Sequence, residues 1–272
     1  MRGLPGQRIK ELGRRLLPPI VVDLLRPRRR DQTGPGFTGR FERYEDARRA
    51  ASASGYENER IIDATVERTR QIRDAVRAQS TFAFNSWTLQ NLAAVFVGLA
   101  TPRRTPLRVL DFGGAMGVHY FTLGPLLGGP AGLDWTICET EATARAGRHH
   151  FADGPLKFTS TLEGLDAPFD AVLASGVLQY VESPADTLTR LAGLSEVLII
   201  NRVPLVDEPD HLAVQTAPGG PSYPAWFFSE REWLGRIEKA GLGVVMRWSA
   251  PDDTIVLEGK TVIYQGLVAR RG

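Results

Sequence analysis

The chain has 272 residues, of which 43% are hydrophobic and 24% are charged, a composition typical of a globular protein. Its single cysteine excludes an internal disulfide framework and a cysteine-based zinc site, and the histidines and acids lack the spacing of metal ligands. The net charge of +2 is unevenly placed, because residues 1–30 contain nine Arg or Lys and two acids, which leaves the rest of the chain at −5.

Residues 1–40 are expected to form a basic, partly flexible N-terminal arm. No apolar run approaches the roughly 18 residues of a membrane span, and Pro18-Pro19 interrupts the apolar pieces that a secretory signal needs. We therefore expect a cytoplasmic protein. Its arm either makes a peripheral contact with an anionic membrane through residues 1–30, centred on Arg26–Arg30, or is a solvated tail. No nucleic-acid partner is expected, because the arm has few aromatic side chains and the remaining chain is acidic.

The segment 41–105 is predicted to be a helical extension. Apolar residues recur at helical spacing over 57–78, and a second helix is predicted over 86–100. Such helices cannot bury their apolar stripes alone, so they are expected to pack on the following domain as a cap. Residues 31–39 are predicted to be a turn-rich linker.

From residue 106 onward short apolar runs alternate with helical stretches. This pattern predicts an α/β domain over 106–272 with βαβ crossovers and a mostly parallel sheet. Strands are predicted over 107–111, 133–138, 155–159, 169–174 and 195–201, and helices over 117–127, 140–150, 184–194 and 230–241. The last two β-like runs, 243–249 and 261–269, have no helix between them and should pair antiparallel.

The strand at 107–111 runs directly into a glycine-rich turn and then a helix, which predicts a ligand cradle. Glycines let a ligand approach the backbone, and the N–H groups of a helix N-terminus face it. Asp111, Gly113, Gly114 and Gly117 are therefore assigned to cofactor binding. The spacing differs from the Gly-x-Gly-x-x-Gly of a dinucleotide site, and an acid before the glycines suits a cation such as S-adenosyl-L-methionine (SAM). An ordinary strand-to-helix turn is the alternative.

Two further segments strengthen the ligand interpretation. Glu139 follows the second strand, where a carboxylate can accept hydrogen bonds from both hydroxyls of a ribose. Alone, such an acid is more often a charge at the start of a helix. Ser175 and Gln179 directly follow the fourth strand and are expected to face the cofactor.

In order and spacing, the segments Asp111–Gly117, Glu139 and Phe169–Val181 resemble the motifs of class I SAM-dependent methyltransferases. The resemblance covers about residues 106–270. It implies a Rossmann-like, seven-stranded sheet with an antiparallel last strand, and SAM as the cofactor. Two features depart from the family pattern: Ala115 replaces the middle glycine of the loop, and the acid that often contacts adenine is missing after the third strand.

More narrowly, the chain resembles one methyltransferase family of undefined substrate. The shared segments include Asn201–Pro204 and Tyr223–Phe228. Tyr180, Arg202, Tyr223 and Trp226 are accordingly assigned to the substrate pocket. Tyr223 and Trp226 fall in Val203–Ser229, which is expected to be a long loop, and they either floor an apolar or sugar-stacking pocket or anchor that loop to the core.

A hydroxyl nucleophile usually needs a general base for methyl transfer. His119, just after the glycine loop, and His211, in the expected loop, are candidate catalytic residues. Asp207 or Asp210 can act as the base or orient His211. The alternatives are a helix-start histidine without a catalytic role and solvated loop charges.

The leading hypothesis is a SAM-dependent methyltransferase acting on a hydroxyl of a small molecule or glycan. The alternative is a catalytically inactive SAM-binding partner or regulatory protein, which Ala115 and the absence of an obvious base motivate. A dinucleotide-dependent oxidoreductase or epimerase would share the fold, but the chain lacks that glycine fingerprint and a Tyr-x-x-x-Lys pair.

Overall fold

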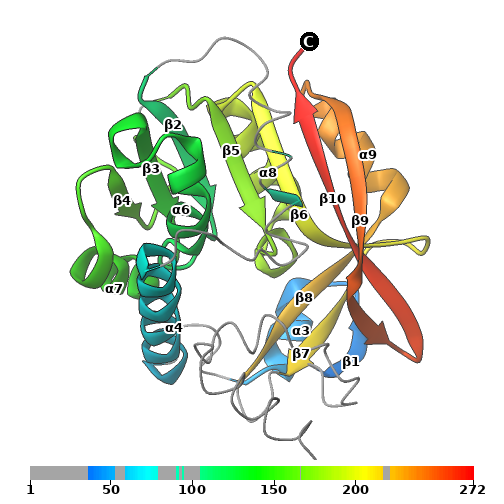
Figure 1. The fold of residues 1–272 in the computed structure, drawn as a ribbon. Helices are drawn as coiled ribbons and strands as arrows, with labels where there is room; N and C mark the ends of the chain where they lie inside the picture. Colours follow the sequence, from blue (N-terminus) through cyan, green and yellow to red (C-terminus); the bar gives the residue numbers. More distant parts are fainter. Residues whose placement is uncertain are drawn as a thin grey trace, which may run out of the picture.

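The computed structural model describes residues 36–52, 59–78, 90–91, 94, 105–165, 167–216 and 221–272. Seven strands form a sheet in the order β4-β3-β2-β5-β6-β10-β9 (Figure 1). The first five in that order run parallel, and β10 is antiparallel to both of its neighbours, which confirms the predicted Rossmann-like, mostly parallel sheet. The strands are β2 (Leu107–Phe112), β3 (Leu133–Cys138), β4 (Leu156–Thr159), β5 (Ala171–Ser175), β6 (Val197–Val206), β9 (Gly243–Leu257) and β10 (Lys260–Arg270).

Helices cover both faces of this sheet (Figure 1). On one face Val66, Tyr120 and Phe151 of α4, α6 and α7 join the strands in a common core. On the other face Leu191 of α8 and Trp233 of α9 do the same. The helices are α4 (Glu59–Ala78), α6 (Val118–Leu123), α7 (Glu141–Phe151), α8 (Pro184–Leu194) and α9 (Glu230–Lys239), with short 3-10 turns η1 (Gly124–Leu127), η2 (Pro130–Gly132) and η3 (Leu178–Tyr180).

The helix predicted over 57–78 is present as α4 and packs on the domain that follows it. Besides its apolar contacts, Arg70 Nη2 lies 3.0 Å from Nδ1 of His150 on α7. The second predicted helix, 86–100, lies largely outside the described residues, of which Gln90, Asn91 and Ala94 are helical. Residues 1–35 of the predicted arm also lie outside them.

A second, antiparallel sheet lies below the carboxyl ends of the parallel strands in the view of Figure 1. It consists of β1 (Gly36–Phe41), β7 (His211–Thr216) and β8 (Ser222–Ser229), and α3 (Tyr44–Ala50) packs on it. The expected loop over Val203–Ser229 is therefore wrong, because most of it forms the end of β6, β7 and β8. The linker expected over 31–39 is wrong from Gly36 onward, where β1 begins.

The apolar pattern of the sequence did not predict β7 and β8 for two reasons. β7 is buried on both faces, because Ala213 and the neighbouring Leu212 belong to different apolar clusters, so the strand lacks polar alternation. β8 contains Pro224, which normally argues against a strand. It is tolerated there because, among the strands that the structure describes, β6 joins β8 only at Phe228 and Ser229, so that no described strand pairs with β8 on that side near the proline.

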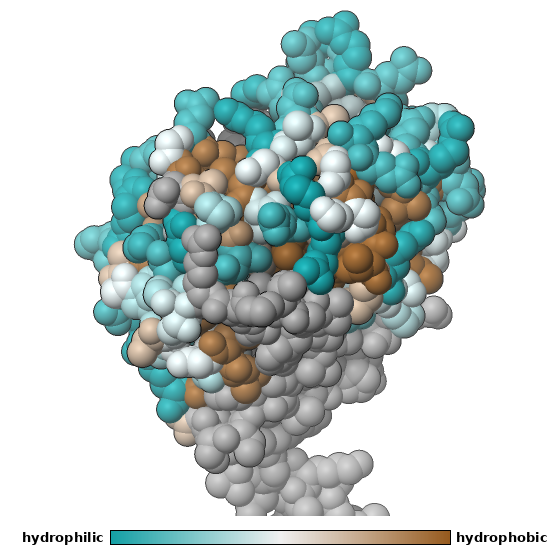
Figure 2. Space-filling model, turned by 90° about the horizontal axis from the view of Figure 1, so that it is seen from above, coloured by the Kyte–Doolittle hydropathy of each residue, from teal (hydrophilic) through white to brown (hydrophobic). Residues whose placement is uncertain are grey.

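Seen from the end that is uppermost in Figure 1, the described surface is mainly hydrophilic, with smaller hydrophobic areas between the polar ones (Figure 2). Among the described residues, four large apolar side chains are exposed, namely Leu126, Val245, Val256 and Ile263. Among the helices that the structure describes, none is long and apolar enough to cross a membrane.

Candidate functional site

The carboxyl end of β2 is the topological switch point of the large sheet. From β2 the chain builds β3 and β4 on one side and then returns to build β5 and β6 on the other. Ligands of open α/β sheets bind outside the carboxyl ends of the strands at such a point. The glycine loop, Gly113–Gly117, lies there between β2 and α6.

The backbone of this loop requires residues without bulky side chains. Gly113 has a φ of 70° and donates its N–H to the carbonyl oxygen of Cys138 at 2.9 Å. A Cβ at Gly113 would lie 2.3 Å from Val177 Cγ2, and one at Gly114 would lie 2.3 Å from Asp111 Oδ2. The two glycines thus allow the loop to pack closely against β2 and the segment after β5.

The Asp111 carboxylate is fully buried, with 0% of the residue exposed. It accepts a hydrogen bond from Trp135 Nε1 at 3.3 Å and lies 3.0 Å from Nδ1 of His119. The carboxylate is therefore directed into the protein beneath the glycine loop. Its predicted direct contact with a cofactor cation stays a prediction, and the contacts that the structure shows hold the loop and α6 together.

His119 is buried between two polar side chains. The Asp111 carboxylate assigns the proton to Nδ1, and Nε2 then faces the amide Nδ2 of Asn91 at 3.4 Å. Both ring nitrogens are engaged, so this arrangement favours a positioning role for His119 over that of a general base. Asn91 was not singled out from the sequence, because its contacts lie 28 and 84 residues away in the chain.

Glu139 lies at the end of β3, beside the glycine loop, as predicted. Its carboxylate accepts the backbone N–H of Ala115 at 3.0 Å through Oε1 and that of Thr140 at 3.0 Å through Oε2. Burial raises the pKa of Glu139, and the Asp111 charge adds to this, while the two N–H groups lower it in part. The loop and this carboxylate therefore form one hydrogen-bonded unit at the switch point.

Ser175 and Gln179, the other predicted cofactor residues, follow the neighbouring strand β5. Asn91 Nδ2 donates to Ser175 Oγ at 3.5 Å, so the Asn91 side chain reaches the carboxyl edge of the sheet. Gln179 is only 2% exposed, and its Oε1 has no hydrogen-bond partner within the described structure. A buried carbonyl oxygen without a partner costs about 1–3 kcal/mol, which a ligand donor would offset.

The four predicted substrate-pocket residues gather at the junction of the two sheets. The Tyr180 hydroxyl donates to Gln215 Oε1 at 2.8 Å, and its ring meets that of Tyr223 edge-on at 5.5 Å. Trp226 Nε1 donates to the carbonyl of Val181 at 3.1 Å, which anchors β8 to the segment after η3. Arg202 lies on β6 at the same junction, paired with a carboxylate of β9.

The predicted catalytic residues His211 and Asp207 lie in different surroundings. His211 begins β7, where Nδ1 lies 2.9 Å from the carbonyl oxygen of Pro209 and the ring stacks on Phe227 at 5.5 Å. Asp207 is exposed in the turn before β7. Asp210 accepts the N–H of Ser229 at 2.7 Å and binds Arg236, so it holds β8 and α9 in place. None of these contacts links them to the glycine loop.

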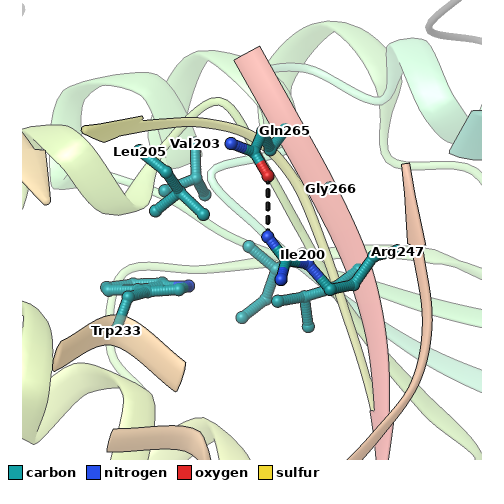
Figure 3. A pocket seen from close by; sticks show the side chains of 8 residues that line it. Ile200, Val203, Leu205, Trp233, Arg247, Gln265 and Gly266 are labelled. Carbon is teal, nitrogen blue, oxygen red and sulfur yellow. Dashed lines mark hydrogen bonds between the residues drawn. The ribbon is translucent and has the colours of Figure 1, made fainter. Parts of the chain in front are cut away.

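A narrow gap lies on the α9 face of the sheet, between β6, β10 and the Trp233 ring (Figure 3). A hydrogen bond of 2.9 Å from Arg247 to Gln265 Oε1 closes it on one side. Its lining is apolar apart from these two residues and the Trp233 indole, and it includes no residue of the glycine loop. It is therefore not the candidate site.

The described part of the chain shows neither a metal-binding cluster nor a reactive thiol. No group of three or more His, Cys, Asp or Glu residues there is placed to hold a metal ion. Cys138 is buried, and burial, aided by the Glu139 charge, raises the pKa of its thiol to about 12. A thiol with this pKa stays protonated and is a poor nucleophile at neutral pH.

The strand order is that of a Rossmann-like methyltransferase fold with a mostly parallel sheet and antiparallel strands. No protein-family model matches the chain, and no curated protein matches it, so the narrower family resemblance is not confirmed. The chain is similar in structure to several solved proteins, among them two described as methyltransferases.

Three of these have low sequence identity to the chain. The N-terminal domain of EvdMO1 with SAH bound has 16% identity and a TM-score of 0.48, with 75% of this chain and 97% of that chain covered. The 1,6-didemethyltoxoflavin-N1-methyltransferase of Burkholderia thailandensis, with S-adenosylhomocysteine, has 20% identity and a TM-score of 0.47, covering 76% and 88%. The magnesium protoporphyrin IX methyltransferase of Synechocystis, with SAM, has 16% identity and a TM-score of 0.44, covering 81% and 100%. Similarity at this level concerns the fold alone.

Proposed function

We propose that the protein is a SAM-dependent methyltransferase that acts on a hydroxyl group of a small molecule or glycan. One observation carries the proposal: the Glu139 carboxylate and the glycine loop form a hydrogen-bonded unit at the switch point of the sheet, joined by the 3.0 Å contact from Ala115. The sequence motif and the geometry therefore select the same residues.

The described residues fit this cofactor. Gly113 and Gly114 let the loop pack closely against Val177 and Asp111, which sets the backbone shape of the proposed cradle. Glu139 accepts the ribose hydroxyls, and the unpartnered Oε1 of Gln179 is a buried acceptor available to a donor group of the ligand. When bound, SAM supplies an electrophilic methyl group on a sulfonium. Asp111 and Glu139 supply the negative charge that favours this cation.

On the acceptor side, the protein positions the nucleophile next to the cofactor half of the site. β5 lies beside β2 and β6 lies beside β5, and adjacent strands are about 5 Å apart. Alignment of two reactants can lower the barrier by several kcal/mol, which makes positioning the main contribution of this chain. His119 fixes the glycine loop through Asp111, so its contribution is orientation.

The second candidate is a SAM-binding protein without methyltransferase activity. The engagement of both His119 nitrogens favours it, because no described side chain at the glycine loop then offers a free base. Methylation of any acceptor by the purified protein would remove this candidate.

The two candidates share cofactor binding, which a thermal-shift experiment tests first. We expect SAM and S-adenosylhomocysteine to raise the melting temperature of the full chain, since a ligand at 100 times its Kd adds about 2.7 kcal/mol of stability. NAD serves as the control and should leave the melting temperature unchanged. A shift with NAD alone would instead support the dinucleotide-dependent enzyme class.

A further inference from the structure

Strand β6 changes direction at Arg202. Arg202 has a φ of 56°, in the left-handed region that favours glycine over residues with a side chain. The pairing with β10 shifts at the same point, because Ile200 faces Leu267 whereas Val203 faces Gln265. Two residues of β6 thus oppose one of β10, which is a β-bulge. Bulges re-aim side chains and are frequent beside active sites.

The bulge directs the Arg202 guanidinium into a cluster at the carboxyl edge of the sheet. The guanidinium makes a bidentate ion pair with Asp253 of β9, which is 8% exposed, and stacks on the Tyr264 ring at 5.0 Å. A Cβ added to Gly176, in the loop after β5, would lie 3.2 Å from Arg202 Nη1. Val177, the next residue, packs against Gly113, so Arg202 lies one loop away from the proposed cofactor cradle.

Phenol and amide groups surround this ion pair. The Tyr180 hydroxyl donates to Gln215 at 2.8 Å, and the Tyr180 phenol lies close enough to Tyr264 to raise the pKa of that phenol. Tyr44 of α3, the helix that packs on the small sheet, donates to the Tyr180 carbonyl at 3.5 Å and so holds η3 in place. The cluster draws on both sheets, and it exists because β1, β7 and β8 fold under the carboxyl edge.

Among the described residues of the cluster, the Arg202 guanidinium is paired with the Asp253 carboxylate. Burial alone would lower the pKa of Arg202, but the hydrogen bond and charge of Asp253 outweigh it, so the guanidinium stays ionised. Burial, together with the Tyr180 phenol, raises the pKa of Tyr264, which stays neutral. An anion that approached Arg202 would be repelled by the Asp253 carboxylate, and a cation that approached Asp253 would be repelled by the Arg202 guanidinium. Hydroxyl groups suit both, because they donate to the carboxylate and accept from the guanidinium.

We infer that Arg202 and Asp253, with Tyr180 and Gln215, form the acceptor subsite and that it selects an uncharged, polyhydroxylated ring of the sugar class. The inference rests on the proposed function and names the substrate class of that site. The edge-on pair of Tyr180 and Tyr223 adds aromatic surface of the kind that packs against the C–H face of a sugar ring.

Three probes with the same ring test the inference by saturation-transfer NMR on the full chain: methyl β-glucopyranoside, glucose 6-phosphate and glucosamine. The test variant is Arg202→Gly with Asp253→Asn, because glycine accepts the left-handed backbone and the paired change leaves no buried charge alone. The control is Arg247→Gln, which removes an arginine paired with Glu230 and Gln265.

We expect the neutral glucoside to bind the wild type and the Arg247→Gln control equally, and to bind the double variant at least tenfold more weakly. The phosphate and the amine should bind the wild type more weakly than the glucoside. No glucoside signal from the wild type, tighter binding of the phosphate, or undiminished binding by the double variant would overturn the inference.

A SAM titration of the same proteins separates the two proposals. Binding of SAM by the double variant shows that its fold and cofactor cradle are intact, so that a loss of glucoside binding supports the subsite. Glucoside binding without SAM binding in the wild type would contradict the proposed function while supporting a sugar site.

Discussion

Ala115 stands where the glycine loop has a φ of 51°, a backbone conformation that glycine adopts without strain. Its N–H is also the group that binds Glu139, so the strained residue lies at the centre of the proposed cradle. The sequence showed that the middle glycine was replaced. The structure shows that the replacement retains the backbone shape of a glycine.

We expect Ala115→Gly to raise the free energy of unfolding by about 1 kcal/mol or less, because relief of the left-handed strain exceeds the added entropy of the unfolded chain. Urea denaturation measures the change. Ala146→Gly, within α7, is the control and should lower stability by about 1 kcal/mol. A loss of stability at both positions would show that Ala115 is not strained.

Glu139 makes cofactor binding dependent on pH. Its pKa is raised above the usual glutamate value of about 4.3, chiefly by burial, and only the ionised form accepts hydrogen bonds through both oxygens. We expect the affinity for SAM to fall as the pH falls through this raised pKa.

The contribution of Glu139 to folding stability has the opposite pH dependence. Because the pKa of this carboxyl rises on folding, the folded protein loses stability as the pH rises through the same window. Calorimetric titrations at several pH values, beside melting curves of the free protein, measure both. If the affinity for SAM and the stability of the free protein both fell as the pH fell through this window, the proposed role of Glu139 would be contradicted.

At the scale of single elements, glycines in helices provide a matched pair. In α7, a Cβ at Gly147 would lie 2.4 Å from the ring of Phe158, whereas in α9 Gly235 has no atom within 4 Å of an added Cβ. Alanine is normally favoured over glycine in a helix by about 1 kcal/mol.

Gly147→Ala should therefore destabilise the protein by about 1–3 kcal/mol through overpacking, while Gly235→Ala should stabilise it by up to about 1 kcal/mol. Chemical denaturation of the two variants compares them directly. Equal stabilisation by both would mean that α7 does not pack closely on β4.

The predicted elements divide according to how local their signals are. β2, β3 and the helices α4, α7 and α8 follow from apolar periodicity, and α8 has the predicted bounds. β1, β7 and β8 were missed, because Leu212 and Ala213 are buried on opposite faces and Pro224 lies within a strand. Their form depends on partners distant in the chain.

The same division applies to the candidate site. The glycine loop and Glu139 are readable from spacing along the chain. The contact of Asn91 with His119 spans 28 residues, that of Tyr180 with Gln215 spans 35, and the pair Arg202–Asp253 spans 51. No local sequence pattern predicts such pairs. The bulge that orients the Arg202 side chain forms only when β10 pairs with β6.

At the scale of the whole molecule, we propose that the basic residues 1–30 bring the protein to anionic membrane surfaces. Each basic residue near such a surface contributes about 1 kcal/mol. Because β1 begins at Gly36 and pairs with β7, a chain lacking residues 1–30 keeps the small sheet intact.

In co-sedimentation, we expect the full chain to pellet with phosphatidylserine vesicles at low salt and to be released at high salt, since salt screens exposed charges. The chain lacking residues 1–30 should stay in the supernatant. Equal pelleting of the two chains would discard the membrane contact without affecting the catalytic proposal.

The central claim is that Glu139 and the glycine loop hold SAM, and calorimetric titration tests it most directly. Wild type, Glu139→Ala and Glu141→Ala would be titrated with SAM and with S-adenosylhomocysteine, Glu141 being an exposed acid two residues away that binds Arg148. We expect the wild type and Glu141→Ala to bind alike and Glu139→Ala to bind at least tenfold more weakly, a difference of about 1.4 kcal/mol. No binding by the folded wild type, or equal loss in both variants, would contradict the account.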